Sequence, residues 1–99
     1  MAKVIFSVQY EVDQTNKDQY LSVVKELKTL LKAEGLEKYS VYEVKGKSLQ
    51  YQEIYEFSSM EAYEAFDDND NERINILIGK LSDLTNKNTT KYSTMFEVS

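Results

Sequence analysis

Residues 4–31 read VIFSVQYEVDQTNKDQYLSVVKELKTLL, and this stretch decides the fold because its hydrophobic period changes partway along it. Its first nine residues alternate at period two between strongly apolar and mixed side chains, which predicts a strand over residues 3–12. From Lys17 onward the apolar side chains recur three and four residues apart, which predicts a helix with one buried stripe. That stripe consists of Tyr20, Val23, Val24, Leu27, Leu30 and Leu31.

Polar residues mark both ends of this helix. Thr15 with Asp18, or Asn16 with Gln19, has the spacing of a cap and a third helical residue. Gly35 follows the stripe as a residue suited to the left-handed conformation beyond a helix end, with Leu36 beside it for the accompanying apolar contact.

Two further strands are expected at residues 38–45 and 48–57, around Gly46-Lys47. A glycine in the first central position suits a two-residue hairpin turn, and such a turn fixes the register. On one face it would pair Val44 with Leu49, Tyr42 with Tyr51 and Ser40 with Glu53, with Tyr55 and Phe57 continuing that face. The other face would carry Tyr39, Val41, Glu43, Gln50, Gln52 and Ile54.

The second half of the chain repeats the order of helix and strand. A helix is expected to start at Ser58 or Ser59, because Ser58 and Glu61 have the spacing of a capping box. The acidic run 67–71 predicts a break or kink, since Asp and Asn compete for backbone hydrogen bonds. A second stripe, from Ile74 to Leu84, predicts another helix from about residue 72. A polar loop over 86–90 and a last strand over 92–98 complete the pattern.

This order favours one α+β domain over residues 1–99 with the ferredoxin-like βαββαβ topology. Its four-stranded antiparallel sheet would carry helices on one face only. The strands carry apolar side chains at both odd and even positions, that is, on both faces of the sheet, so the uncovered face would expose apolar area. We therefore expect a homodimer through the open sheet face.

Composition excludes several classes of function. The 99 residues contain no His, Cys, Trp or Pro, which removes disulfides, thiolate chemistry and histidine chemistry. The net charge of −5 has the wrong sign for a phosphate-binding surface, so no nucleic acid is expected as a partner. No apolar run is long enough for a secretion signal or a membrane span, and a cytoplasmic location without membrane contact is the expectation.

The acidic run 67–71 resembles the start of a calcium-binding loop. Asp67, Asn69 and Asn71 match the first, third and fifth positions of an EF-hand, but Glu72 stands where glycine is needed and Ile78 where a bidentate Glu is needed. Neither this run nor the remaining residues predict a metal site, and no cofactor is expected.

The tyrosine-rich hairpin is the remaining candidate site. In the predicted register Glu53 lies between Tyr51 and Tyr55 and near Tyr42, in an aromatic setting that would desolvate its carboxyl group and raise the pKa. Such a carboxyl can act as a general acid or base. Alternatively, Glu53 is hydrogen-bonded to tyrosine hydroxyls, or to Lys in a dimer interface, because Tyr-rich faces are often interfaces. The candidate ligand-binding residues are therefore Tyr42, Tyr51, Glu53 and Tyr55.

The sequence resembles the dimeric α+β barrel superfamily, and within it the antibiotic biosynthesis monooxygenase-like group. The resemblance covers almost the whole chain and is carried mostly by core positions and turns. The stretches that carry it are Tyr10-x-Val12, residues 17–20, Gly35-Leu36, residues 39–42 and residues 55–63.

This resemblance implies a homodimer whose sheets pack face to face, with a ligand cavity between sheet and helices in the active relatives. Enzymes of the group oxidise aromatic polyketides without a cofactor or degrade haem, using Asn, Trp and often His. Here Phe66 stands where relatives often place that His, so haem degradation is not expected. The leading hypothesis is a homodimeric barrel protein that binds a small apolar or aromatic ligand, with no catalytic residues assigned. The alternatives are a cofactor-independent monooxygenase or isomerase acting on an aromatic small molecule, and a regulatory or assembly module.

Overall fold

The computed structural model describes residues 2–32, 34–66 and 72–98. The elements follow the predicted order of strands and helices, with the second helical segment in two pieces. They are β1 (Val4–Val12), α1 (Lys17–Leu30), β2 (Leu36–Glu43), β3 (Gln50–Phe57), α2 (Met60–Phe66), α3 (Glu72–Leu84) and β4 (Thr85–Phe96). The predicted kink and the segment compared with a calcium-binding loop fall largely on residues 67–71, which lie outside the described residues.

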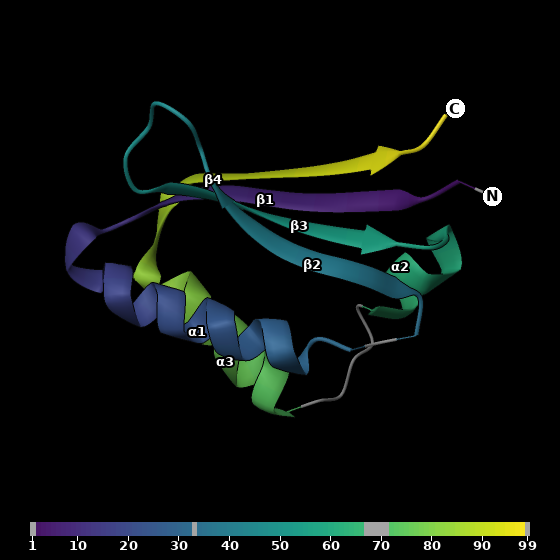
Figure 1. Cartoon of the computed structure of the whole chain (residues 1–99), viewed down its shortest axis with the longest axis horizontal. Coiled ribbons are helices and arrows are strands. Elements are labelled where there is room, and N and C mark those ends of the chain that lie inside the picture. Colours follow the sequence, from purple (N-terminus) through teal and green to yellow (C-terminus); the bar gives the residue numbers. More distant parts are fainter. Residues whose placement is uncertain (1, 33, 67–71, 99) are drawn as a thin grey trace.

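The four strands form one antiparallel sheet in the order β2-β3-β1-β4. Figure 1 shows α1 and α3 lying together against one face of this sheet, while α2 sits at the end where β3 finishes. No helix of the described part of the chain covers the opposite face. The ferredoxin-like βαββαβ prediction is therefore confirmed, and the hydrophobic core lies between the sheet and α1 and α3.

The entry into α1 differs in detail from the prediction. Asp13 accepts a hydrogen bond from the Thr15 N–H (3.1 Å) and caps a short 3-10 turn over Gln14–Asn16. Asn16 makes no side-chain cap hydrogen bond, so neither predicted capping pair forms as expected. The helix nevertheless begins at Lys17 as predicted, because its start is fixed by the buried stripe rather than by the cap.

Gly35 occupies the left-handed conformation that its position predicts, with φ of +85°. Its carbonyl accepts the Ser58 N–H at 2.8 Å, which ties the beginning of β2 to the end of β3. A Cβ atom at this position would overlap the side chain of Ala62 in α2. Glycine is therefore required here both by the backbone and by the close approach of α2.

The predicted hairpin register is wrong by one residue. The connection is not a two-residue turn but a five-residue loop, 45–49, closed by a hydrogen bond from the Val44 N–H to the Gln50 carbonyl. Leu49 takes a positive φ of 65° to complete it. An odd number of loop residues shifts the pairing, so that Tyr42 lies opposite Gln52 and Val41 opposite Glu53.

This shift reverses the side chains of β2 over residues 38–43, because neighbouring residues in a strand point to opposite faces. Tyr39 and Val41, which the prediction placed away from Glu53, share its face. Tyr42 and Ser40, which the prediction placed beside Glu53, belong to the open face. Tyr42 is 52% exposed there, whereas Tyr39 is buried.

The last strand begins earlier than predicted. The polar segment 86–90, expected as a loop, belongs to β4, which pairs with β1 from Thr85 onward. The pairing is irregular, since Gln9 lies opposite Lys91 and Glu11 opposite Asn86. Residues 87–90 of β4 therefore lie opposite the single residue Tyr10 of β1 and form a bulge with more extra residues than the usual one.

The open face of the sheet mixes apolar and polar side chains. Ile5 and Ile54 are half-buried near its centre, and Met95 is exposed on β4. None of the helices in the described part of the chain has the length and apolarity needed to cross a membrane.

Candidate functional site

A buried carboxyl group surrounded by tyrosines forms the centre of the candidate site. Glu53 is only 4% exposed and points from β3 toward the helices. Its Oε1 atom accepts hydrogen bonds from the hydroxyls of Tyr39 (2.7 Å) and Tyr55 (3.1 Å). The two donors come from the two strands of the hairpin, Tyr39 from β2 and Tyr55 from β3, and their rings contact each other with centroids 4.8 Å apart.

Burial changes the ionisation of this cluster. Loss of water raises the pKa of Glu53, although hydrogen bonds from the hydroxyls of Tyr39, Tyr10 and Tyr55 partly oppose the shift. Burial, followed by the nearby Glu53 charge, also raises the pKa of Tyr10, Tyr39 and Tyr55. The cluster therefore favours neutral groups and holds a carboxyl whose proton is released at a higher pH than usual. The predicted desolvation of Glu53 is confirmed, and so is its hydrogen bonding to tyrosine hydroxyls.

A second group of tyrosines packs next to the first, between α1 and the sheet. The hydroxyls of Tyr10 and Tyr20 are 2.8 Å apart, and the Tyr20 ring packs on Tyr51 with centroids 4.9 Å apart. All three side chains are buried. This group joins α1 to β1 and β3, so it fixes the position of Tyr10 beside Glu53.

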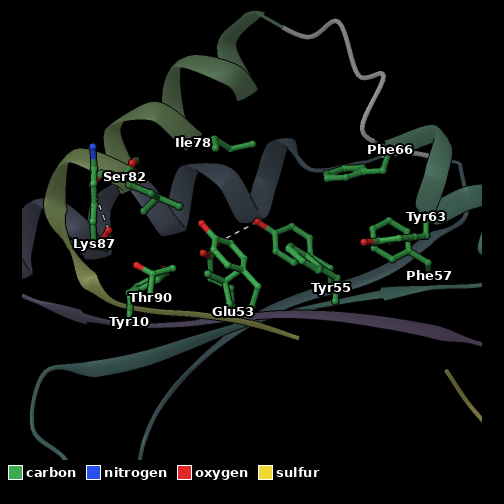
Figure 2. A pocket seen from close by; sticks show the side chains of 15 residues that line it. Tyr10, Glu53, Tyr55, Phe57, Tyr63, Phe66, Ile78, Ser82, Lys87 and Thr90 are labelled. Atoms are coloured by element: carbon green, nitrogen blue, oxygen red, sulfur yellow. Dashed lines mark hydrogen bonds between the residues drawn. The ribbon is translucent and has the colours of Figure 1, made fainter. Parts of the chain in front are cut away.

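A cavity of about 530 Å³ opens beside Glu53, between the sheet on one side and α2 and α3 on the other. Ligand pockets commonly have volumes of roughly 300–1000 Å³. In Figure 2 the side chains of Phe57, Tyr63 and Phe66 gather at one end, Glu53 lies in the middle, and Lys87 and Ser82 lie at the other end. The remaining lining residues are Phe6, Val8, Tyr10, Tyr55, Ile78, Leu81, Thr85, Thr90 and Tyr92.

The structure separates the four residues predicted to bind a ligand. Glu53 and Tyr55 both line the cavity. Tyr51 is buried against Tyr20 under α1 and is not among the cavity-lining residues. Tyr42 lies on the open face, because of the register shift. Only two of the four are therefore placed to touch a molecule in this cavity.

Sequence reasoning missed three polar contributors to the site. The predicted register places Tyr39 on the wrong face, and the strand pattern marks Tyr10 only as a core residue of the first strand. The polar composition of residues 86–90 predicts a loop at Lys87. A signal for Tyr10 existed, since its parity matches that of Val8 and Val12 on the face that α1 must cover. No signal in the sequence fixed the hairpin loop length or the bulge in β4.

The described residues include no group of three or more His, Cys, Asp or Glu side chains arranged to hold a metal ion. What the cavity offers instead is aromatic surface, one carboxyl group, tyrosine hydroxyls and one ammonium group. This donor set suits an organic molecule with an aromatic or apolar body.

The fold matches that of solved structures described as antibiotic biosynthesis monooxygenases, in agreement with the fold that the sequence resemblance implies. The sequence itself matches no protein-family model and no curated protein. The likeness therefore rests on solved structures.

Three solved structures illustrate this likeness. A conserved protein of unknown function from Bacteroides thetaiotaomicron, described as a possible oxidoreductase, is 18% identical with a TM-score of 0.79, covering 97% of this chain and 98% of its own. A conserved protein from Methanosarcina mazei is also 18% identical, with a TM-score of 0.81 and coverage of 96% and 92%. A mutant of SnoaB, a cofactor-independent oxygenase from Streptomyces nogalater, is 13% identical, with a TM-score of 0.78 and coverage of 98% and 94%.

At such low identity these likenesses establish the fold alone. Proteins that share a fold often differ in function, so the function has to be argued from the site.

Proposed function

We propose that this protein binds a small aromatic molecule in the cavity between the sheet and helices α2 and α3. The observation that carries the proposal is the cavity itself, which joins aromatic walls to a buried hydrogen-bonding cluster at Glu53. A planar ring would pack at the aromatic end of the cavity, against Phe66 and Tyr63, and a hydroxyl or carbonyl group on it would reach the Glu53 cluster.

The same observation disfavours a purely structural module. A protein that serves only assembly has no need of a cavity, since filling it would add packing contacts and stability. Here a volume of about 530 Å³ is left open beside a desolvated carboxyl group. Burying that carboxyl has a cost in free energy, which ligand binding or catalysis would explain.

A blocked cavity provides the test. Ile78 lies on α3 at the cavity, while Ile76 lies on the same helix with similar exposure (39% and 46%) but outside the cavity lining. Ile78→Trp is expected to weaken binding of 2-naphthol at least about tenfold by calorimetric titration, because the indole occupies ligand volume. Ile76→Trp should leave the affinity unchanged. Equal losses in both variants, or no loss in either, would contradict the proposal.

A second candidate function is cofactor-independent oxygenation of the bound molecule. The observation that favours it is the raised pKa of Glu53 inside the cavity, which makes the ionised carboxylate a stronger base than usual. Taking a proton from a ring methylene next to a carbonyl would leave an anion able to reduce dioxygen. Overall, one methylene group and one O₂ would become one carbonyl group and one water. SnoaB is a cofactor-independent oxygenase with this fold.

We also propose that two copies associate through the open sheet face. A sheet with helices on one side only leaves Ile5, Ile54, Met95 and Tyr42 without a covering layer, and a second copy would bury them.

Light scattering at micromolar concentration is expected to give twice the 11.5 kDa of one chain. Ile54→Lys should shift this mass toward that of a monomer, because it places a charge at the centre of the contact. Leu21→Lys adds the same charge on the outer side of α1, where Leu21 is 43% exposed, and should leave the mass unchanged. A monomer mass for the wild-type protein would refute the dimer.

A further inference from the structure

The bulge in β4 has a direct relation to the cavity. Residues 87–90 lie opposite Tyr10, and the Tyr10 hydroxyl group belongs to the Glu53 cluster. The Thr89 hydroxyl holds the bulge in place, since it accepts the Glu11 N–H at 2.9 Å and donates to the Asn86 carbonyl at 2.7 Å. Bulges next to binding sites commonly redirect side chains, and here Lys87 and Thr90 become part of the cavity lining.

Lys87 is the only basic residue among the described residues that line the cavity, and Glu53 is the only acidic one. Figure 2 places Lys87 at the end opposite Phe66 and Tyr63, beside Ser82. The salt bridges found within residues 2–32, 34–66 and 72–98 join Lys3 to Glu37 and Arg73 to Glu26. Lys87 thus has no acidic partner in this part of the chain, and its ammonium group is available to a ligand.

The cavity is therefore polarised along its length. One end is aromatic, the middle offers a carboxyl group and tyrosine hydroxyls, and the other end offers an ammonium group with the hydroxyls of Ser82 and Thr90. A ligand complementary to this order has an aromatic ring system at one end and an anionic group at the other.

We propose that the ligand is an aromatic acid whose carboxylate pairs with Lys87 while its ring system packs at the aromatic end of the cavity, against Phe66. This rests on the proposed binding function and adds the charge and the orientation of the ligand. The net charge of the protein is −5, so its overall field repels anions. A preference for an anion over its neutral analogue would therefore require a local cation at the site.

The test compares 2-naphthoate with 2-naphthamide, which have nearly the same shape but differ in charge. The wild-type protein is expected to bind 2-naphthoate up to about fivefold more tightly, the upper end of the range for one partly exposed ion pair. Lys87→Gln should remove this preference by weakening 2-naphthoate alone. Added salt should reduce the preference in the wild-type protein, since it screens the pair.

Lys91→Gln is the matched control. It changes the net charge by the same amount, but Lys91 lies opposite Gln9 on the open face and outside the cavity lining. It should preserve the preference. Equal affinity for the two compounds in the wild-type protein would overturn the inference while leaving the binding function intact, and so would equal weakening of both by Lys87→Gln. Failure of both compounds and of 2-naphthol to bind would overturn the binding function as well.

Discussion

Phe57→Ala is expected to lower the free energy of unfolding by about 3–5 kcal/mol, the usual cost of removing a fully buried aromatic side chain. Phe57 is 1% exposed, and its ring contacts Tyr63 and Phe66 of α2, with centroids 5.5 and 5.4 Å apart. The substitution removes the surface on which α2 rests and the aromatic end of the cavity together. Urea unfolding followed by circular dichroism measures the loss.

Phe96 supplies a closely matched control. Val4 lies opposite Phe57 on one side and Phe96 on the other, so both rings belong to the same sheet face. Phe96 is 52% exposed because the helices do not cover β4 at that point. Phe96→Ala should therefore cost less than about 1 kcal/mol. Similar losses in the two variants would contradict the placement of the helical layer.

Glu53→Gln is expected to make the protein more stable than the wild type at neutral pH, by a margin that grows as the pH rises. The pKa of Glu53 in the folded protein is raised by burial above its value in the unfolded chain, about 4.3. Below that value both states hold the proton, and the carboxyl imposes no ionisation cost. Above it the unfolded chain releases its proton first, so the folded state loses stability until the folded pKa is passed.

Each unit of this pKa shift corresponds to about 1.4 kcal/mol. Urea unfolding at several pH values between 4 and 8 gives the free energy of unfolding of the wild type and of Glu53→Gln. In the difference between the two, the contributions of all the carboxyl groups that they share cancel. Glu56→Gln removes a carboxyl from the same strand but from the opposite face, and should follow the wild-type profile more closely. A wild-type advantage that increases with pH would contradict the raised pKa.

The same variant tests the oxygenase candidate without confusion from unfolding. Since Glu53→Gln is expected to be well folded at neutral pH, loss of dioxygen consumption with an anthrone would reflect the missing base. Removal of a general base commonly lowers the rate by about 10²- to 10⁴-fold. Consumption at the wild-type rate would eliminate Glu53 as the base.

The first strand and first helix could be predicted from sequence because their periodicity is long and undisturbed. Nine residues at period two and a stripe through Leu31 fix both elements, whatever the capping residues do. The prediction of the hairpin register was wrong because the register depends on the length of the loop, which the strand pattern does not determine. Gly46 does adopt a positive φ, as a tight turn would require, but Leu49 does so too, and a Leu in that conformation has no sequence signal.

The candidate site could be predicted only in part, for a similar reason. The aromatic setting of Glu53 follows from the parity of β3, which places Tyr55 on the same face. The position of its hydrogen-bonding partner Tyr39 depends on the hairpin register. The position of Lys87 depends on a bulge whose residues have the composition of a polar loop. The cavity itself is volume that the helices do not fill, and periodicity carries no information about that volume.

The central claim is that an aromatic molecule occupies the cavity beside Glu53, and an amide chemical-shift titration with 2-naphthol tests it most directly. We expect saturable shifts at the backbone amides of cavity residues such as Tyr10, Ser82 and Thr90, and loss of these shifts in Ile78→Trp. Shifts confined to residues remote from the cavity, such as Tyr42 and Met95 on the open face, or no saturable shifts at all, would contradict the claim.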